Sequence, residues 1–112
     1  MGLVKEQWEF LKDVARLIKK AEELNIVLTG GELYRPQEMQ EIYVSQGKSK
    51  TMKSNHRRRL AIDFNFFIDD SLTYSKEDIQ ELGDYWESLN PKNRWGGNWI
   101  GFVDVPHFER NV

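Results

Sequence analysis

The chain has 112 residues and contains no cysteine. This absence excludes disulfide bridges, thiolate zinc sites and cysteine nucleophiles, so a metal site must use histidines and carboxylates. Histidine is scarce as well, because His56 and His107 are the only two. No apolar run approaches the length that spans a membrane. The net charge of −2 gives no general attraction to nucleic acid or anionic lipid.

The remaining composition is that of one small globular domain. Hydrophobic residues make up 39% of the chain and aromatic residues 12%, which supports a packed core rather than disorder. The length suits a single domain over residues 1–112, which we expect to be a monomer. The first residues include acidic side chains and lack the apolar centre of a signal peptide, so we expect synthesis in the cytoplasm.

Hydrophobic spacing predicts alternating helices and strands. We expect helices at 3–24, 36–47 and 75–90, and strands at 26–29, 60–67, 99–103 and 107–109. In the first helix, the stripe Val4, Trp8, Leu11, Ala15 and Ile18 and the neighbouring stripe Phe10, Val14, Leu17, Ala21 and Leu24 are both expected to pack in the core. This order predicts an α+β fold, with a small, mainly antiparallel sheet flanked by about three helices.

Two short segments contain the side chains that suit zinc. The segment SNHRRRLAID holds His56 and Asp63, and the segment DVPHFE holds Asp104 and His107. Two histidines and one carboxylate can hold zinc and leave a fourth position open for water. Asp104 could then handle the proton of that water. Isolated histidines are usually surface or hydrogen-bonded residues, but here the ionisable groups adjoin apolar, strand-like sequence, where unpaired charge is costly.

Other residues could complete a hydrolytic site. Arg35, beside Tyr34 and after a Gly-rich turn, could stabilise an oxyanion, or it could be an ordinary surface arginine. Ser54 could bond a substrate or simply belong to a turn. Trp95 could line a cleft or pack in the core, whereas core packing is the favoured interpretation for Trp99.

The polar loop 48–58 and the residue after it are rich in basic side chains. The basic residues are Lys48, Lys50, Lys53, Arg57, Arg58 and Arg59. A nucleic-acid interface is disfavoured, because no aromatic stacking pair is interleaved with them and acidic residues dominate elsewhere. A basic rim would also suit an anionic polymer such as a bacterial cell wall.

Together these motifs resemble one family, which covers about residues 29–109. SNHRRRLAID is similar to the Ser-x-His-(x)6-Asp motif of the zinc D-Ala-D-Ala carboxypeptidases and L-alanyl-D-glutamate endopeptidases of peptidoglycan. DVPHFE resembles the second motif of that family, and Tyr34-Arg35 resembles its upstream Tyr-Arg element. The spacing looks most like that of the small phage and prophage endolysins.

The resemblance implies a function and a set of roles. It implies one zinc held by His56, Asp63 and His107 at the sheet, Asp104 as the catalytic base and Arg35 as a cation for substrate or transition state. The implied substrate is the stem peptide of peptidoglycan. We expect Ser54, Tyr34 and Trp95 to contact it, and we expect no nucleic-acid partner and no insertion into a membrane. An endolysin would act on the wall after release at lysis.

The resemblance leaves alternatives open and has two departures. The implied activity is an L-alanyl-D-glutamate endopeptidase, with a D-alanyl-D-alanine carboxypeptidase or a non-catalytic wall-binding or nucleic-acid-binding module as alternatives. Many family members have Gly where this chain has Arg59, so the path of the loop is expected to differ. Many have Trp or Gly where this chain has Val103.

Overall fold

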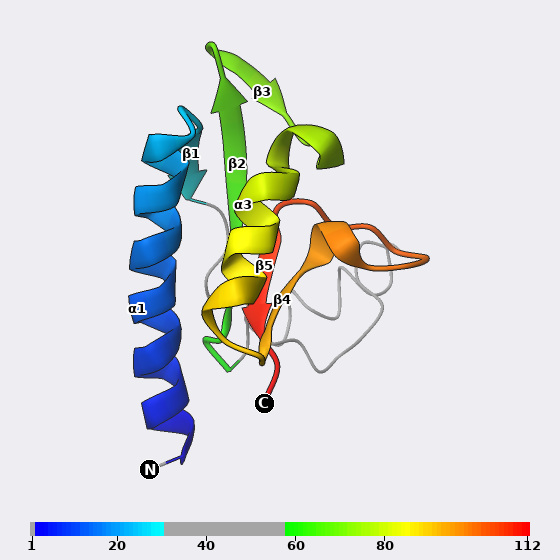
Figure 1. The fold of residues 1–112 in the computed structure, drawn as a ribbon. Coiled ribbons are helices and arrows are strands. Elements are labelled where there is room, and N and C mark those ends of the chain that lie inside the picture. Colours follow the sequence, from blue (N-terminus) through cyan, green and yellow to red (C-terminus); the bar gives the residue numbers. More distant parts are fainter. Residues whose placement is uncertain (1, 31–57) are drawn as a thin grey trace.

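The structure is a computed structural model and describes residues 2–30 and 58–112. The described elements are α1 (Gly2–Glu23), β1 (Val27–Gly30), β2 (Ala61–Ile68), β3 (Ser71–Thr73), α3 (Lys76–Leu89), β4 (Asn93–Trp95), the short 3-10 helix η1 (Gly96–Asn98) and β5 (His107–Arg110) (Figure 1). The expected helix at 36–47 and most of the basic loop lie outside these residues. None of the described helices is long and apolar enough to cross a membrane.

The strands form an antiparallel sheet with β2 at its centre. The order is β1-β2-β5-β4, and β3 also pairs with β2. β1 pairs along one edge of β2, whereas β5 and β3 share the other edge at Ala61–Asp63 and Phe66–Ile68. The α+β class and the antiparallel sheet expected from the sequence are confirmed.

Alternation along the strands separates a packed face from a polar face. Phe64 and Phe66 in β2 are buried and contact Phe108 of β5 edge-on. Phe108 also contacts Trp86 of α3, which meets Phe10 of α1. The two helices therefore pack against each other and against this face of the sheet (Figure 1). Because neighbouring strand residues point to opposite faces, the residues between these aromatics face the other way.

The sequence pattern predicted the strand before β5 at the wrong residues. The expected strand at 99–103 has no regular structure, whereas β4 forms at Asn93–Trp95, inside the expected loop. The reason is burial. Ile100 is fully exposed and Val103 is 55% exposed, so these two apolar side chains are not part of the core, while Asn93 and Trp95 are buried against β5 and α3.

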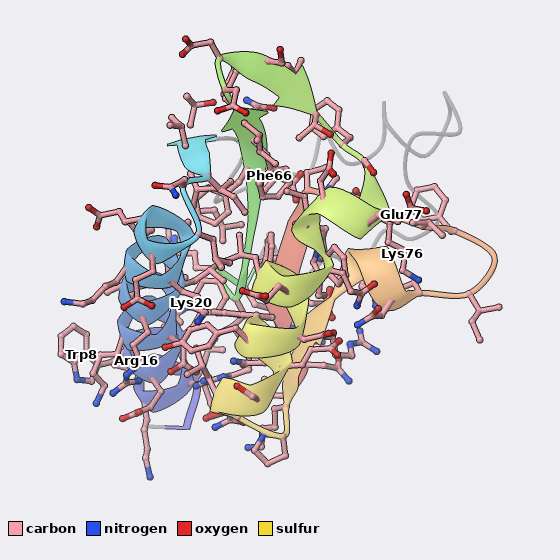
Figure 2. All side chains as sticks on the ribbon, turned by 45° about the horizontal axis from the view of Figure 1, so that its top comes forward. Trp8, Arg16, Lys20, Phe66, Lys76 and Glu77 are labelled. Atoms are coloured by element: carbon pink, nitrogen blue, oxygen red, sulfur yellow. The ribbon has the colours of Figure 1, made fainter. Side chains whose placement is uncertain are left out.

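One of the two apolar stripes on α1 is not part of the core. Val4, Trp8, Leu11 and Ile18 are all between 44% and 59% exposed, and Trp8 projects away from the body of the molecule (Figure 2). Only the stripe that contains Phe10, Val14, Leu17 and Ala21 packs on the sheet and α3. The expectation that both stripes are buried is therefore wrong, because the sheet and α3 cover one side of this helix.

Candidate metal and catalytic site

Asp63 and His107 face each other on the polar side of the sheet. They are directly paired in the β2–β5 register. His107 Nδ1 lies 3.0 Å from Asp63 Oδ1. Two ligands bound to one tetrahedral zinc at its usual bond lengths lie about 3.3 Å apart. Small movements would thus let both atoms bind one metal ion, and this pair fits zinc.

A third side chain, Glu109, was missed by the sequence analysis. His107 Nε2 lies 2.7 Å from Glu109 Oε1. Arg94 of β4 donates to the other oxygen of the same carboxylate, from Nε at 2.9 Å and also from Nη2. The signal was present in the sequence, because residues two apart in a strand share a face. A metal-binding histidine commonly donates its second N–H to a carboxylate, which fixes the orientation of the ring.

The surroundings of His107 favour its protonated form when no metal is bound. Burial lowers the pKa of His107, but hydrogen bonds to Asp63 and Glu109, together with their negative charges, outweigh burial and raise this pKa to about 9. Burial raises the pKa of Glu109, whereas the hydrogen bond and charge of His107, and then those of Arg94, bring it below its usual value. The imidazolium then donates to both carboxylates. Metal binding at Nδ1 requires that this proton leaves.

Asp104 precedes His107 in a tight turn. The His107 amide donates to Asp104 O at 3.1 Å, and the Asp104 amide donates to Gly96 O at 2.9 Å. A third bond, from Phe64 N to Pro106 O at 3.0 Å, ties the turn to β2. The turn therefore places the half-buried residue Asp104 close to His107, the strand residue that suits metal binding.

The structure places Trp95 in the core and Trp99 beside His107. Trp95 is fully buried and belongs to the core. This burial favours the core alternative for Trp95 over a contact with substrate. Trp99 is half-buried, and its ring centroid lies 5.1 Å from that of His107. The Arg94 guanidinium also lies over the Trp99 ring, 5.7 Å from its centroid. Among residues 2–30 and 58–112, Trp99 rather than Trp95 is thus the tryptophan beside His107.

The remaining expected site residues lie outside the described part of the chain. They are Tyr34, Arg35, Ser54 and His56. Within residues 2–30 and 58–112, no group of three or more His, Cys, Asp or Glu side chains is arranged to hold a metal. The described residues therefore supply two of the three expected ligands, and the placement of His56 stays a prediction.

Comparison with known proteins gives three similarities. Residues 47–110 match the sequence profile of the M15 peptidase family described as D-alanyl-D-alanine carboxypeptidase. The chain is 33% identical over 89 residues to the L-alanyl-D-glutamate peptidase of Listeria phage A118, a match that covers 71% of this chain and 29% of the phage protein. The crystal structure of the Serratia marcescens L-Ala D-Glu endopeptidase ChiX superposes with a TM-score of 0.71 at 22% identity, over 89% of this chain and 79% of that one.

Each similarity supports a different conclusion. The profile match covers more than half of the chain and includes His56, Asp63, Asp104 and His107. The likeness to ChiX shows a common fold. The chain spans less than a third of the length of the phage peptidase, so the match concerns one part of that protein.

Proposed function

The chain belongs to the M15 peptidase family, and from this premise we propose that it is a zinc-dependent peptidase that hydrolyses a bond in the stem peptide of peptidoglycan. The observation that carries the proposal is the cross-strand pair Asp63–His107, with Asp104 on the turn that enters β5. A binding module would need neither a pair of metal ligands nor a carboxylate on the adjoining turn.

The proposed roles follow from the chemistry of each group. Asp63, His107 and His56 would hold the metal, which when bound polarises the scissile carbonyl and lowers the pKa of water. Glu109 holds His107 with Nδ1 directed at Asp63. Asp104 would accept the proton of the attacking water and deliver it to the leaving amine. Arg35 would donate to the oxygen that becomes negative in the transition state.

We propose the bond between L-alanine and D-glutamate as the site of cleavage. Both named relatives, from Listeria phage A118 and Serratia marcescens, carry this activity in their names. The second candidate is removal of the terminal D-alanine, which the description of the matched family favours. The two activities release different products from the same pentapeptide substrate.

The masses of the products test both the proposed hydrolysis of stem peptides and the proposed site of cleavage. The zinc-loaded protein is incubated with purified pentapeptide muropeptides, with and without a chelator. Cleavage after L-alanine leaves that residue on the muramic acid and releases a peptide that begins with D-glutamate. Loss of a single alanine would instead indicate the carboxypeptidase. If neither product forms in the presence of zinc, the proposed function is wrong.

We also propose that the protein acts in the manner of a phage endolysin, as the similarity to a phage peptidase suggests. It should be tolerated when expressed in the bacterial cytoplasm. It should lyse cells when added to bacteria with a permeabilised outer membrane, and a chelator should prevent lysis. Intact wall preparations from several bacteria after such treatment would contradict this proposal.

A further inference from the structure

The indole of Trp95 contacts the turn that carries the proposed catalytic carboxylate. Trp95 Nε1 donates a hydrogen bond to the carbonyl oxygen of Val105 at 2.7 Å. Val105 lies between Asp104 and His107. This bond, the Asp104–Gly96 backbone bond and the Phe64–Pro106 backbone bond each hold a different residue of the turn. The indole is thus linked directly to the segment on which both functional side chains depend.

The Trp95 indole is closely packed, and two neighbouring glycines leave no room beside it for a side chain. A Cβ atom built on Gly83 of α3 would overlap Trp95 Cε3, and one built on Gly97 would overlap Trp95 Cζ2. The ring also stacks on Phe108, with 6.3 Å between centroids. Side chains in such close-packed surroundings keep one orientation, so the N–H points at Val105.

The residue beside the turn, Gly96, must also be a glycine. A Cβ on Gly96 would overlap the carbonyl oxygen of Asp104. The backbone of Trp95 is also bound to α3, because its amide donates to Glu87 Oε2 at 3.0 Å. The segment Trp95–Gly97 therefore contacts both α3 and the turn, so the position of the turn depends on α3.

From these contacts we infer that Trp95 is a positioning residue, which sets where the Asp104 carboxylate lies relative to the ligands Asp63 and His107. This inference rests on the proposed function. Asp63 and His107 are held by their strand pairing, whereas Asp104 is outside regular structure and depends on the turn. Loss of the indole N–H should therefore disturb proton transfer more than metal binding. Small displacements of a reacting group can reduce a rate by about a hundredfold.

Two matched variants distinguish an effect on the position of Asp104 from a general loss of core packing. Trp95→Phe keeps an aromatic ring and removes the N–H. Trp86→Phe makes the same change at another fully buried tryptophan, whose Nε1 donates to Arg94 O at 3.2 Å and Glu109 O at 3.1 Å, outside the turn. Both variants lose core volume and one indole donor, so both should lose stability.

Only Trp95→Phe should change the site. We expect its kcat to fall between about tenfold and a hundredfold, with KM unchanged and zinc affinity within about threefold of wild type. In the metal-free protein, the amide protons of Asp104 and His107 should exchange with solvent faster in this variant than in Trp86→Phe, after correction for global stability. Trp86→Phe should keep the wild-type kcat per folded, zinc-loaded molecule, because the bonds that it loses are to the backbone of Arg94 and Glu109, which the pairing of β4 and β5 still holds.

The outcomes are distinguishable. If wild type hydrolyses stem peptides and Trp95→Phe has the same kcat and the same amide exchange as Trp86→Phe, Trp95 is only a core residue and the inference is wrong. If wild type does not hydrolyse them, the proposed function fails and this inference fails with it. Should Trp95→Phe not fold, replacement of Trp95 by 3-benzothienylalanine keeps the shape of the ring, removes only the N–H donor and must produce the same loss of kcat.

Discussion

Asp63 and His107 lie 44 positions apart in the chain and face each other across neighbouring strands, with 3.0 Å between Oδ1 and Nδ1. In the metal-free protein this contact is a hydrogen bond from a protonated ring. In the proposed holoenzyme the same two atoms are metal ligands. The proton and the metal therefore compete for one position, and this competition makes the site testable.

Replacement of His107 by alanine should abolish metal binding. We expect one zinc per chain in wild type purified without chelator, because Asp63 and His107 already converge, and less than about a tenth of that in His107→Ala, since loss of a ligand removes much of the site's affinity. Elemental analysis measures the ratio, and circular dichroism checks the fold. Full zinc content in the variant would remove His107 from the ligand set.

The stability of the metal-free protein should fall as pH rises from 6.5 to 9. The pKa of His107 is raised from 6.5 to about 9 in the folded state, so protonation favours folding. This contribution is complete below the unfolded value and is lost as pH rises through the folded value. The free energy of unfolding should fall by up to about 3 kcal/mol over this window.

Urea denaturation at several pH values measures this change, and His107→Gln is its control. The variant has no imidazole, so its stability should lack the decrease assigned to His107. Zinc affinity should show the opposite trend and rise with pH, because the ligand must be neutral. An equal decrease in wild type and variant would assign the effect to other groups.

Replacement of Glu109 by glutamine should weaken zinc binding by about ten- to a hundredfold. The carboxylate accepts from His107 Nε2 at 2.7 Å and is itself held by Arg94, so it both orients the ring and raises its basicity. Competition with a chromogenic chelator measures the affinity. Glu23→Gln, at a position where the side chain is 59% exposed, is the control and should bind zinc like wild type.

The Asp104→Asn variant should keep its fold and its zinc but lose turnover. We assign Asp104 to proton transfer, for which a general base contributes about a hundred- to ten-thousand-fold in rate. Hydrolysis of muropeptides, zinc content and melting temperature are measured together. Asp84→Asn, on the exposed side of α3, should be fully active. Normal turnover in Asp104→Asn would remove this residue from the mechanism.

Replacement of Arg59 by glycine should stabilise the protein by up to about 1 kcal/mol. Arg59 has φ of 59°, in the left-handed region where a side chain is strained. Arg59→Ala keeps the strain and should not stabilise, so the difference in melting temperature between the two variants isolates the backbone effect. No difference would show that the native contacts of Arg59 offset the strain.

The sequence by itself determined much of this protein. Periodic apolar residues specified α1, β2 and α3, since helix and strand periods differ and each must bury one face. The scarcity of histidine and the absence of cysteine left few residues able to bind zinc. The spacing of Asp104 and His107 around Pro106 indicated a turn with two functional side chains. These features depend on local geometry and on chemistry carried by single residues.

The tertiary structure alone decided which candidates meet. Trp95 and Trp99 are four residues apart in a Gly-rich segment, and nothing local shows which of them enters the core. The outcome depends on Gly83 of α3, which leaves room for the Trp95 indole. The stripe of α1 that contains Trp8 stays exposed because no other described element covers it. The Glu109 carboxylate is bound by Arg94 because β4 and β5 pair and place these two residues opposite each other. Packing partners come from distant parts of the chain, so periodicity cannot specify them.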